Sequence, residues 1–85
     1  MQSISVKNLS SKVVSLIVDD NLIFSDVLPE SYTFFCPTEF GSAHLIVLND
    51  REKAIHDLWV SIAPDSRNIL YIFDTSCCFV TLSHF

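Results

Sequence analysis

The sequence predicts an all-β fold: a two-sheet antiparallel sandwich of about seven or eight short strands, forming a single domain over residues 1–85. Two observations predict it. Apolar residues come in short runs rich in Val, Ile, Leu and Phe, and polar turn residues interrupt these runs at fairly even spacing. Such a rhythm is typical of β-sandwiches. The expected strands are residues 3–7, 12–18, 22–28, 32–36, 43–48, 55–63, 69–73 and 77–85.

The turns between these runs are built from Asn, Asp, Ser and Pro, because the chain contains a single glycine. Residues 19–21, Asp-Asp-Asn, are the strongest hairpin signal, since Asp and Asn tolerate a positive φ better than most side chains. Pro29, Pro37 and Pro64 each stop an apolar run. The sole glycine, Gly41, precedes a strand, and we expect it to have a backbone geometry that other residues resist.

One segment, residues 50–60, has some helical character. Its first residues, 51–54, have helix propensity, but the apolar residues that follow only half fit a period of 3.6. Leu58, Val60 and Ile62 alternate as the residues of a strand do. We therefore expect a strand here, preceded by at most one helical turn.

Several expected strands are apolar at successive positions and would present hydrophobic side chains on both faces. A two-layer sandwich covers only one face of each sheet, and a solvated outer face normally produces clean alternation. Assigning one face of each strand to the core leaves a surplus of outward apolar side chains. The surplus residues are Ile17, Ile46, Leu48, Leu70 and Ile72. We predict that they form an interaction surface together with Trp59.

The composition indicates a folded, soluble domain. Apolar residues make up 49% of the chain and charged residues 18%, which excludes the low hydrophobicity and high charge of disordered chains. The longest apolar runs span four or five residues, far fewer than the roughly 20 of a membrane-spanning helix. The net charge is −5, and Lys and Arg never cluster. We therefore expect neither nucleic acid nor a membrane as a partner.

The cysteines and the start of the chain bear on its compartment. The first residues lack the basic segment and the apolar stretch of a secretory signal, and the three cysteines are an odd number with two of them adjacent. We therefore expect a cytoplasmic protein with three free thiols, Cys36, Cys77 and Cys78, which behave as small buried hydrophobic residues.

Three segments share a rhythm with a known family: residues 16–20 (Leu-Ile-Val-Asp-Asp), 27–32 (Val-Leu-Pro-Glu-Ser-Tyr) and 40–47 (Phe-Gly-Ser-Ala-His-Leu-Ile-Val). Over residues 12–73 the chain resembles the small Ig-like or transthyretin-like bacterial β-sandwich modules of the PEGA kind. Asp20 stands where those modules usually have a hairpin glycine. The resemblance implies a non-catalytic accessory or interaction domain, and it carries over no functional residue.

Metal ligands are not spaced as they are in known sites. His44 and His56 lie far from other ligands in the sequence, and only the fold could bring Cys77, Cys78 and His84 together around zinc. The acids of the turns, Asp19, Asp20 and Asp26, offer oxygen ligands for calcium, but the turns require such residues in any case. We expect no metal and no cofactor.

Catalytic chemistry has equally little support. A thiolate–imidazole pair could form between Cys36 or Cys78 and His44 or His56 if the fold placed them within reach, but no local motif indicates it. We expect that the protein is not an enzyme.

Trp59 is the only tryptophan. In a strictly alternating strand it faces outward, where it can anchor a protein or stack on a sugar ring, whereas a bulge after Asp57 would turn it inward. We predict a non-catalytic interaction module that associates through its apolar surface, either as a homo-oligomer or with another protein. The alternative is a small ligand- or carbohydrate-binding module that uses Trp59, Tyr32 or Tyr71 as stacking surfaces.

Overall fold

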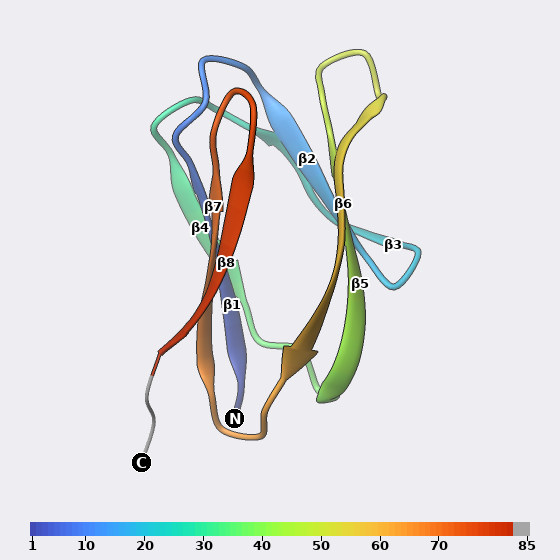
Figure 1. Cartoon of the computed structure of the whole chain (residues 1–85), viewed down its shortest axis with the longest axis vertical. Helices are drawn as coiled ribbons and strands as arrows, with labels where there is room; N and C mark the ends of the chain where they lie inside the picture. Colours follow the sequence, from blue (N-terminus) through green and yellow to red (C-terminus); the bar gives the residue numbers. More distant parts are fainter. Residues whose placement is uncertain (83–85) are drawn as a thin grey trace.

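The structure, a computed structural model, describes residues 1–82. In this range it consists of eight strands in two facing four-stranded sheets, which confirms the predicted all-β sandwich (Figure 1). The β1 sheet has the order β4-β1-β7-β8: β4 (Tyr32–Phe35), β1 (Ser3–Asn8), β7 (Arg67–Ile72) and β8 (Cys77–Leu82). The β5 sheet has the order β3-β2-β5-β6: β3 (Asn21–Val27), β2 (Val14–Val18), β5 (Gly41–Leu48) and β6 (Ala54–Ile62).

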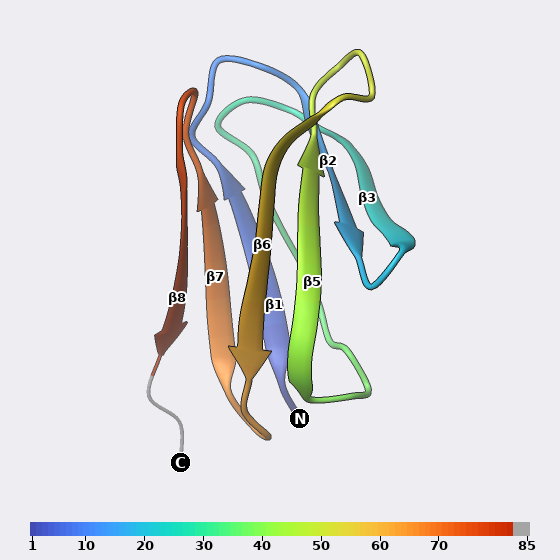
Figure 2. The same ribbon diagram turned by 45° about the vertical axis from the view of Figure 1, so that its right-hand side comes forward.

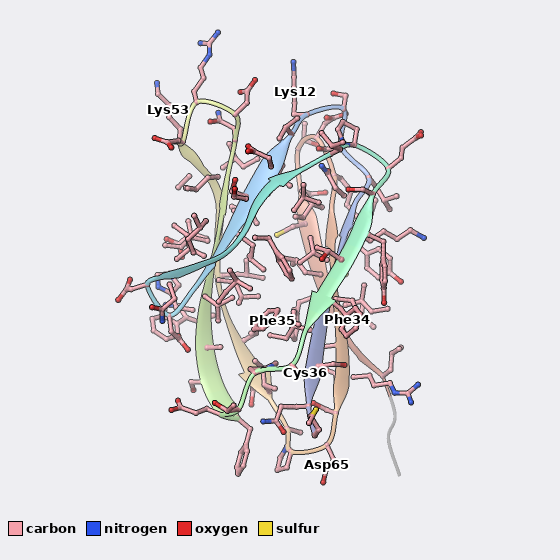
Figure 3. All side chains as sticks on the ribbon, turned by 180° about the vertical axis from the view of Figure 1, so that it is seen from behind. Lys12, Phe34, Phe35, Cys36, Lys53 and Asp65 are labelled. Atoms are coloured by element: carbon pink, nitrogen blue, oxygen red, sulfur yellow. The ribbon has the colours of Figure 1, made fainter. Side chains whose placement is uncertain are left out.

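The hydrophobic core fills the space between the two layers. Figure 2 shows the strands of the two layers from a second angle. Alternation along each strand supplies it. On β2, for example, Leu16 and Val18 are buried, whereas Ile17 between them is only half-buried. Phe35 of β4 projects between the sheets, where its ring meets the ring of Phe24 edge-to-face at 5.5 Å, while Phe34 points away (Figure 3). The core is Ile4, Val6, Val14, Leu16, Val18, Val27, Ala43, Leu45, Val47, Ile62, Leu70 and Ile72.

One pairing departs from the predicted antiparallel arrangement. β1 and β7 run parallel, with Ser3 beside Arg67 and Asn8 beside Ile72, and every other pair among the described strands is antiparallel. Parallel neighbours require a long crossover connection. The chain supplies one here, because the entire β5 sheet is built between β1 and β7.

The turns follow the expected chemistry. Asp19 and Asp20 form a two-residue hairpin loop with φ of 47° and 67°, which confirms the strongest turn signal. The helical turn considered before β6 is absent. The Asn49 side-chain oxygen there accepts hydrogen bonds from the backbone N–H groups of Arg51 and Lys53 at 2.9 and 3.0 Å, so that a capped turn replaces it.

Gly41 has the unusual geometry that the sequence indicates, with φ of 111°. A Cβ atom at this position would contact nothing within 4 Å. The resistance to substitution is therefore a property of the backbone and not of steric crowding.

We expect Gly41→Val to destabilise the domain by more than about 1 kcal/mol, because bulky L-residues resist a positive φ. Gly41→Ala should have a cost of the same order, since no neighbour distinguishes the two side chains. Urea unfolding of both variants measures this. A loss that appears with valine alone would indicate crowding instead of backbone strain.

Leu70 and Ile72 correct the sequence prediction, which placed them on the outer surface. Both are fully buried and belong to the core. The outward positions of β7 are Arg67, Ile69 and Tyr71. The run 69–73 is apolar at every position, so its periodicity alone does not show which face is inside.

Asn68 is a polar residue on the inward side of β7, the side of Leu70 and Ile72, and it is buried. Its amide donates hydrogen bonds to the Ser3 carbonyl at 2.9 Å and to Ser66 Oγ at 3.0 Å, and it accepts one from Thr81 Oγ1 at 2.8 Å. These bonds replace those lost from water, so a polar side chain occupies a core position.

Candidate interaction surfaces

The outward side of the β5 sheet carries a nearly continuous apolar surface, which we call the Trp59 face. The register places Leu22 of β3 beside Ile17 of β2, and Ile17 beside Ile46 of β5. Half-buried residues occupy the middle of the surface because their neighbours in the sheet cover them, while Leu22 and Trp59 are 59% and 70% exposed at its two sides. The face consists of Leu22, Ile17, Ile46, Leu48, Ile55 and Trp59.

Trp59 faces outward, which decides between the two interpretations that its sequence allowed. The irregularity in β6 lies where Ala54 and His56 pair with β5, before Trp59 is reached, and it leaves the outward orientation intact. The indole stacks on the imidazole of the neighbouring His44, with ring centres 4.4 Å apart and an angle of 4° between the planes. His44 Nε2 in turn lies 2.5 Å from Asp57 Oδ1. The exposed indole of Trp59 is thus held in place by the His44 ring.

The charges at the Trp59 face are negative. Asp57 lies on β6 beside Ile46, and Asp19 and Asp20 form the turn at one end of the sheet. The four strands that make up the β5 sheet contain no Lys or Arg. An apolar centre with acidic neighbours is therefore what this face presents to a partner.

The outward side of the β1 sheet forms a second surface, the Phe34 face, which the sequence prediction missed. Its aromatic members are Tyr32, half-buried Tyr71, and Phe34, which is 58% exposed. Its charged members are both basic, Lys7 of β1 and Arg67 of β7. The face consists of Tyr32, Phe34, Lys7, Arg67, Ile69, Tyr71, Val80 and Leu82.

A groove of about 330 Å³ crosses the Phe34 face. Ser5 forms part of its lining and donates or accepts a hydrogen bond of 3.1 Å with the Tyr32 hydroxyl. Tyr32 and Phe34 line it from β4, and Arg67 and Leu82 line it from β7 and β8. The small Ser5 side chain between larger neighbours creates the hollow.

Four of the six residues predicted for the interaction surface gather on the Trp59 face: Ile17, Ile46, Leu48 and Trp59. The prediction missed Leu22 and Ile55. Leu22 could have been found from the two-residue hairpin, because such a loop pairs Leu22 with Ile17. Ile55 could not, because a register irregularity determines its position.

The three aromatic residues proposed as sugar-stacking surfaces do not form one site. Tyr32 and Tyr71 lie in the same row of the β1 sheet, on either side of Lys7. Trp59 lies on the opposite sheet. A ligand that stacks on Trp59 therefore does not contact either tyrosine of the same chain.

Titratable side chains are dispersed. Among residues 1–82 no three His, Cys, Asp or Glu side chains gather as metal ligands would. Asp19 and Asp20 lie at one end of β3 and Asp26 near the other. Neither His44, on the outward side of the β5 sheet, nor His56, on its inward side, shares a sheet with Cys78. His84 lies outside the described residues.

The three cysteines are free, as predicted, but they are not all buried. Cys36 and Cys78 are exposed, and only Cys77 packs against the core. Cys36 follows the short edge strand β4, and the Cys78 side chain lies on the outward face of β8, beside Tyr71. Burial, followed by the neighbouring Cys78, raises the pKa of the Cys77 thiol.

We expect Cys36 and Cys78 to alkylate in the native protein well before Cys77. A raised pKa leaves less thiolate at a given pH, and the thiolate is the nucleophile. Raising the pH should therefore accelerate the alkylation of Cys77. Time-resolved iodoacetamide labelling with mass spectrometry follows each site, and equal rates for Cys77 and Cys78 would contradict the assigned parity.

The described residues include no helix that is long and apolar enough to cross a membrane. No family model matches the chain, and a search of curated proteins found no match to its sequence.

Proposed function

We propose that this protein is a non-catalytic association module whose Trp59 face binds a second copy of the chain. The observation that carries the proposal is the apolar row from Leu22 through Ile17 to Ile46, with the exposed Trp59 diagonally opposite Ile46 on β6, next to Asp57. Contiguous exposed apolar surface beyond a few hundred Å² is rare on monomeric proteins and marks interaction sites.

The dimensions of the face indicate a weak complex. Four strands at a spacing of about 4.8 Å and six residues at about 3.3 Å each give roughly 400 Å² in projection per copy. The buried total is then near the low end of specific interfaces, below about 1,200 Å², where transient complexes lie. Burial of the six side chains contributes a favourable free energy similar in size to the estimated 4–15 kcal/mol cost of association. We expect a micromolar dissociation constant.

A matched pair of leucines tests the proposal. Leu22 on the Trp59 face and Leu28 in the β3–β4 turn are 59% and 60% exposed. Sedimentation equilibrium of the wild type should show oligomers at about 100 μM and monomers at about 1 μM. Leu22→Glu should abolish the oligomers, and Leu28→Glu should leave them unchanged. A wild-type protein that stays monomeric at about 100 μM would refute self-association.

Carbohydrate binding is the second candidate, and exposed Trp59 beside the Asp57 carboxylate favours it. Sugar sites place several free hydrogen-bonding groups around the aromatic ring, whereas His44 and Asp57, which lie next to Trp59, already bond to each other. We therefore expect Trp59 fluorescence to stay unchanged when oligosaccharides are titrated against the monomer. A saturable change would favour the carbohydrate-binding function instead.

A further inference from the structure

We infer that copies of this chain associate head-to-tail, with Trp59 of one copy inserted into the groove of the Phe34 face of the next. This inference rests on the self-association proposed above and names the second surface involved. It follows from two properties in which the two outer faces of the sandwich complement each other, which are shape and charge.

The shapes complement each other as a knob and a hole. Trp59 projects from the Trp59 face with 70% of its surface exposed, held by its stack on His44. The groove of about 330 Å³ on the opposite sheet is lined by Phe34, Leu82 and Arg67. Aromatic rings pack edge-to-face, and a guanidinium over an indole adds a cation–π attraction. The groove thus offers suitable partners for an indole.

The charges also complement each other. The charged side chains at the Trp59 face include Asp57 and the turn acids Asp19 and Asp20, whereas those of the Phe34 face are the basic Lys7 and Arg67. Two Trp59 faces packed together would bring carboxylates against carboxylates, which disfavours a symmetric dimer. Contact between unlike faces brings Asp57 near Arg67 and lets opposite charges determine the orientation.

The two faces lie on opposite sides of the sandwich, and this determines the form of the assembly. A contact between different surfaces leaves one free copy of each surface at the ends. Each added chain can therefore accept another, so that the mean mass grows with concentration instead of stopping at a dimer. The net charge of −5 on each copy opposes this growth and limits it.

Two complementary variants test the arrangement. Trp59→Lys removes the knob and places a cation opposite Arg67, and Phe34→Glu places a carboxylate opposite Asp57. The control is Phe40→Glu, because Phe40 is equally exposed, at 62%, but lies in the β4–β5 loop outside both faces. Thermal unfolding of each variant establishes that it is folded.

In the head-to-tail arrangement each variant alone should be monomeric at concentrations at which the wild type and Phe40→Glu associate. Mixing Trp59→Lys with Phe34→Glu should restore binding as a 1:1 complex, because each supplies the intact face that the other lacks. Sedimentation velocity measures both results. If Phe34→Glu alone still associates while Trp59→Lys does not, the association uses the Trp59 face symmetrically and the inference is wrong, although the proposed function stands. If the wild type never associates, the proposed function fails as well.

Discussion

Leu70→Ala is expected to destabilise the domain by about 2 to 5 kcal/mol. Leu70 is fully buried between the sheets, beside Val6 of β1 and Phe79 of β8. Truncation removes the transfer free energy of three carbon atoms and leaves a cavity in a closely packed interior. Because domains of this size are stable by only about 5–15 kcal/mol, such a loss is a large fraction of the total.

Ile69→Ala is the matched control, since Ile69 is the adjacent aliphatic residue on the outward face of the same strand. It should cost less than about 1.5 kcal/mol, because a half-buried side chain leaves an accessible surface and not a closed cavity. Urea unfolding of the two variants measures the difference. Equal losses, or a larger loss at Ile69, would mean that the parity of β7 is the reverse of the one described.

Asn8→Ala is expected to cost about 3 kcal/mol or more. Asn8 is fully buried at the end of β1, and its amide donates to the carbonyls of Lys12 and Val27 at 2.8 and 3.0 Å. Its side-chain oxygen accepts hydrogen bonds from the backbone N–H and the hydroxyl of Ser10 at 3.0 and 2.6 Å. Val27 belongs to the other sheet, so this side chain joins the two layers.

Removal of the amide leaves several buried polar groups without partners, at about 1–3 kcal/mol each. Asn21→Ala is the control, because Asn21 is exposed and its amide makes a single hydrogen bond, of 3.1 Å, to the Asp19 carbonyl. We expect less than about 1 kcal/mol there. If Asn8→Ala and Asn21→Ala lose the same stability in thermal unfolding, the buried network at Asn8 does not join the sheets as described.

The strands were predictable because turn chemistry and apolar runs are local properties. The Asp19-Asp20 loop shows this well, since two acids that tolerate a positive φ determine the hairpin and its pairing. The parallel β1–β7 pair was not predictable in the same way. Residues more than 60 positions apart form it, and no local signal records which distant strands become neighbours.

The candidate surface was predictable where strand parity was unambiguous. Ile17 lies between two core residues of a strand that ends in a short hairpin, so its outward direction follows from alternation. On β7 the run 69–73 is apolar at every position, so alternation alone does not show which face is inside. Ile69 and Tyr71 of the Phe34 face were missed for this reason, because they have the opposite parity to Leu70 and Ile72.

The central claim is that the Trp59 face is buried by a second copy, and the fluorescence of Trp59 tests it most directly, because this is the only tryptophan in the chain. Between about 1 μM and about 100 μM the fraction of associated chains rises for a weak interface. Over this range the Trp59 emission should shift to shorter wavelengths and its quenching by acrylamide should fall. Leu22→Glu should abolish both changes. Emission and quenching that stay constant over this range would contradict the claim, even if sedimentation showed oligomers, because the interface would then lie elsewhere.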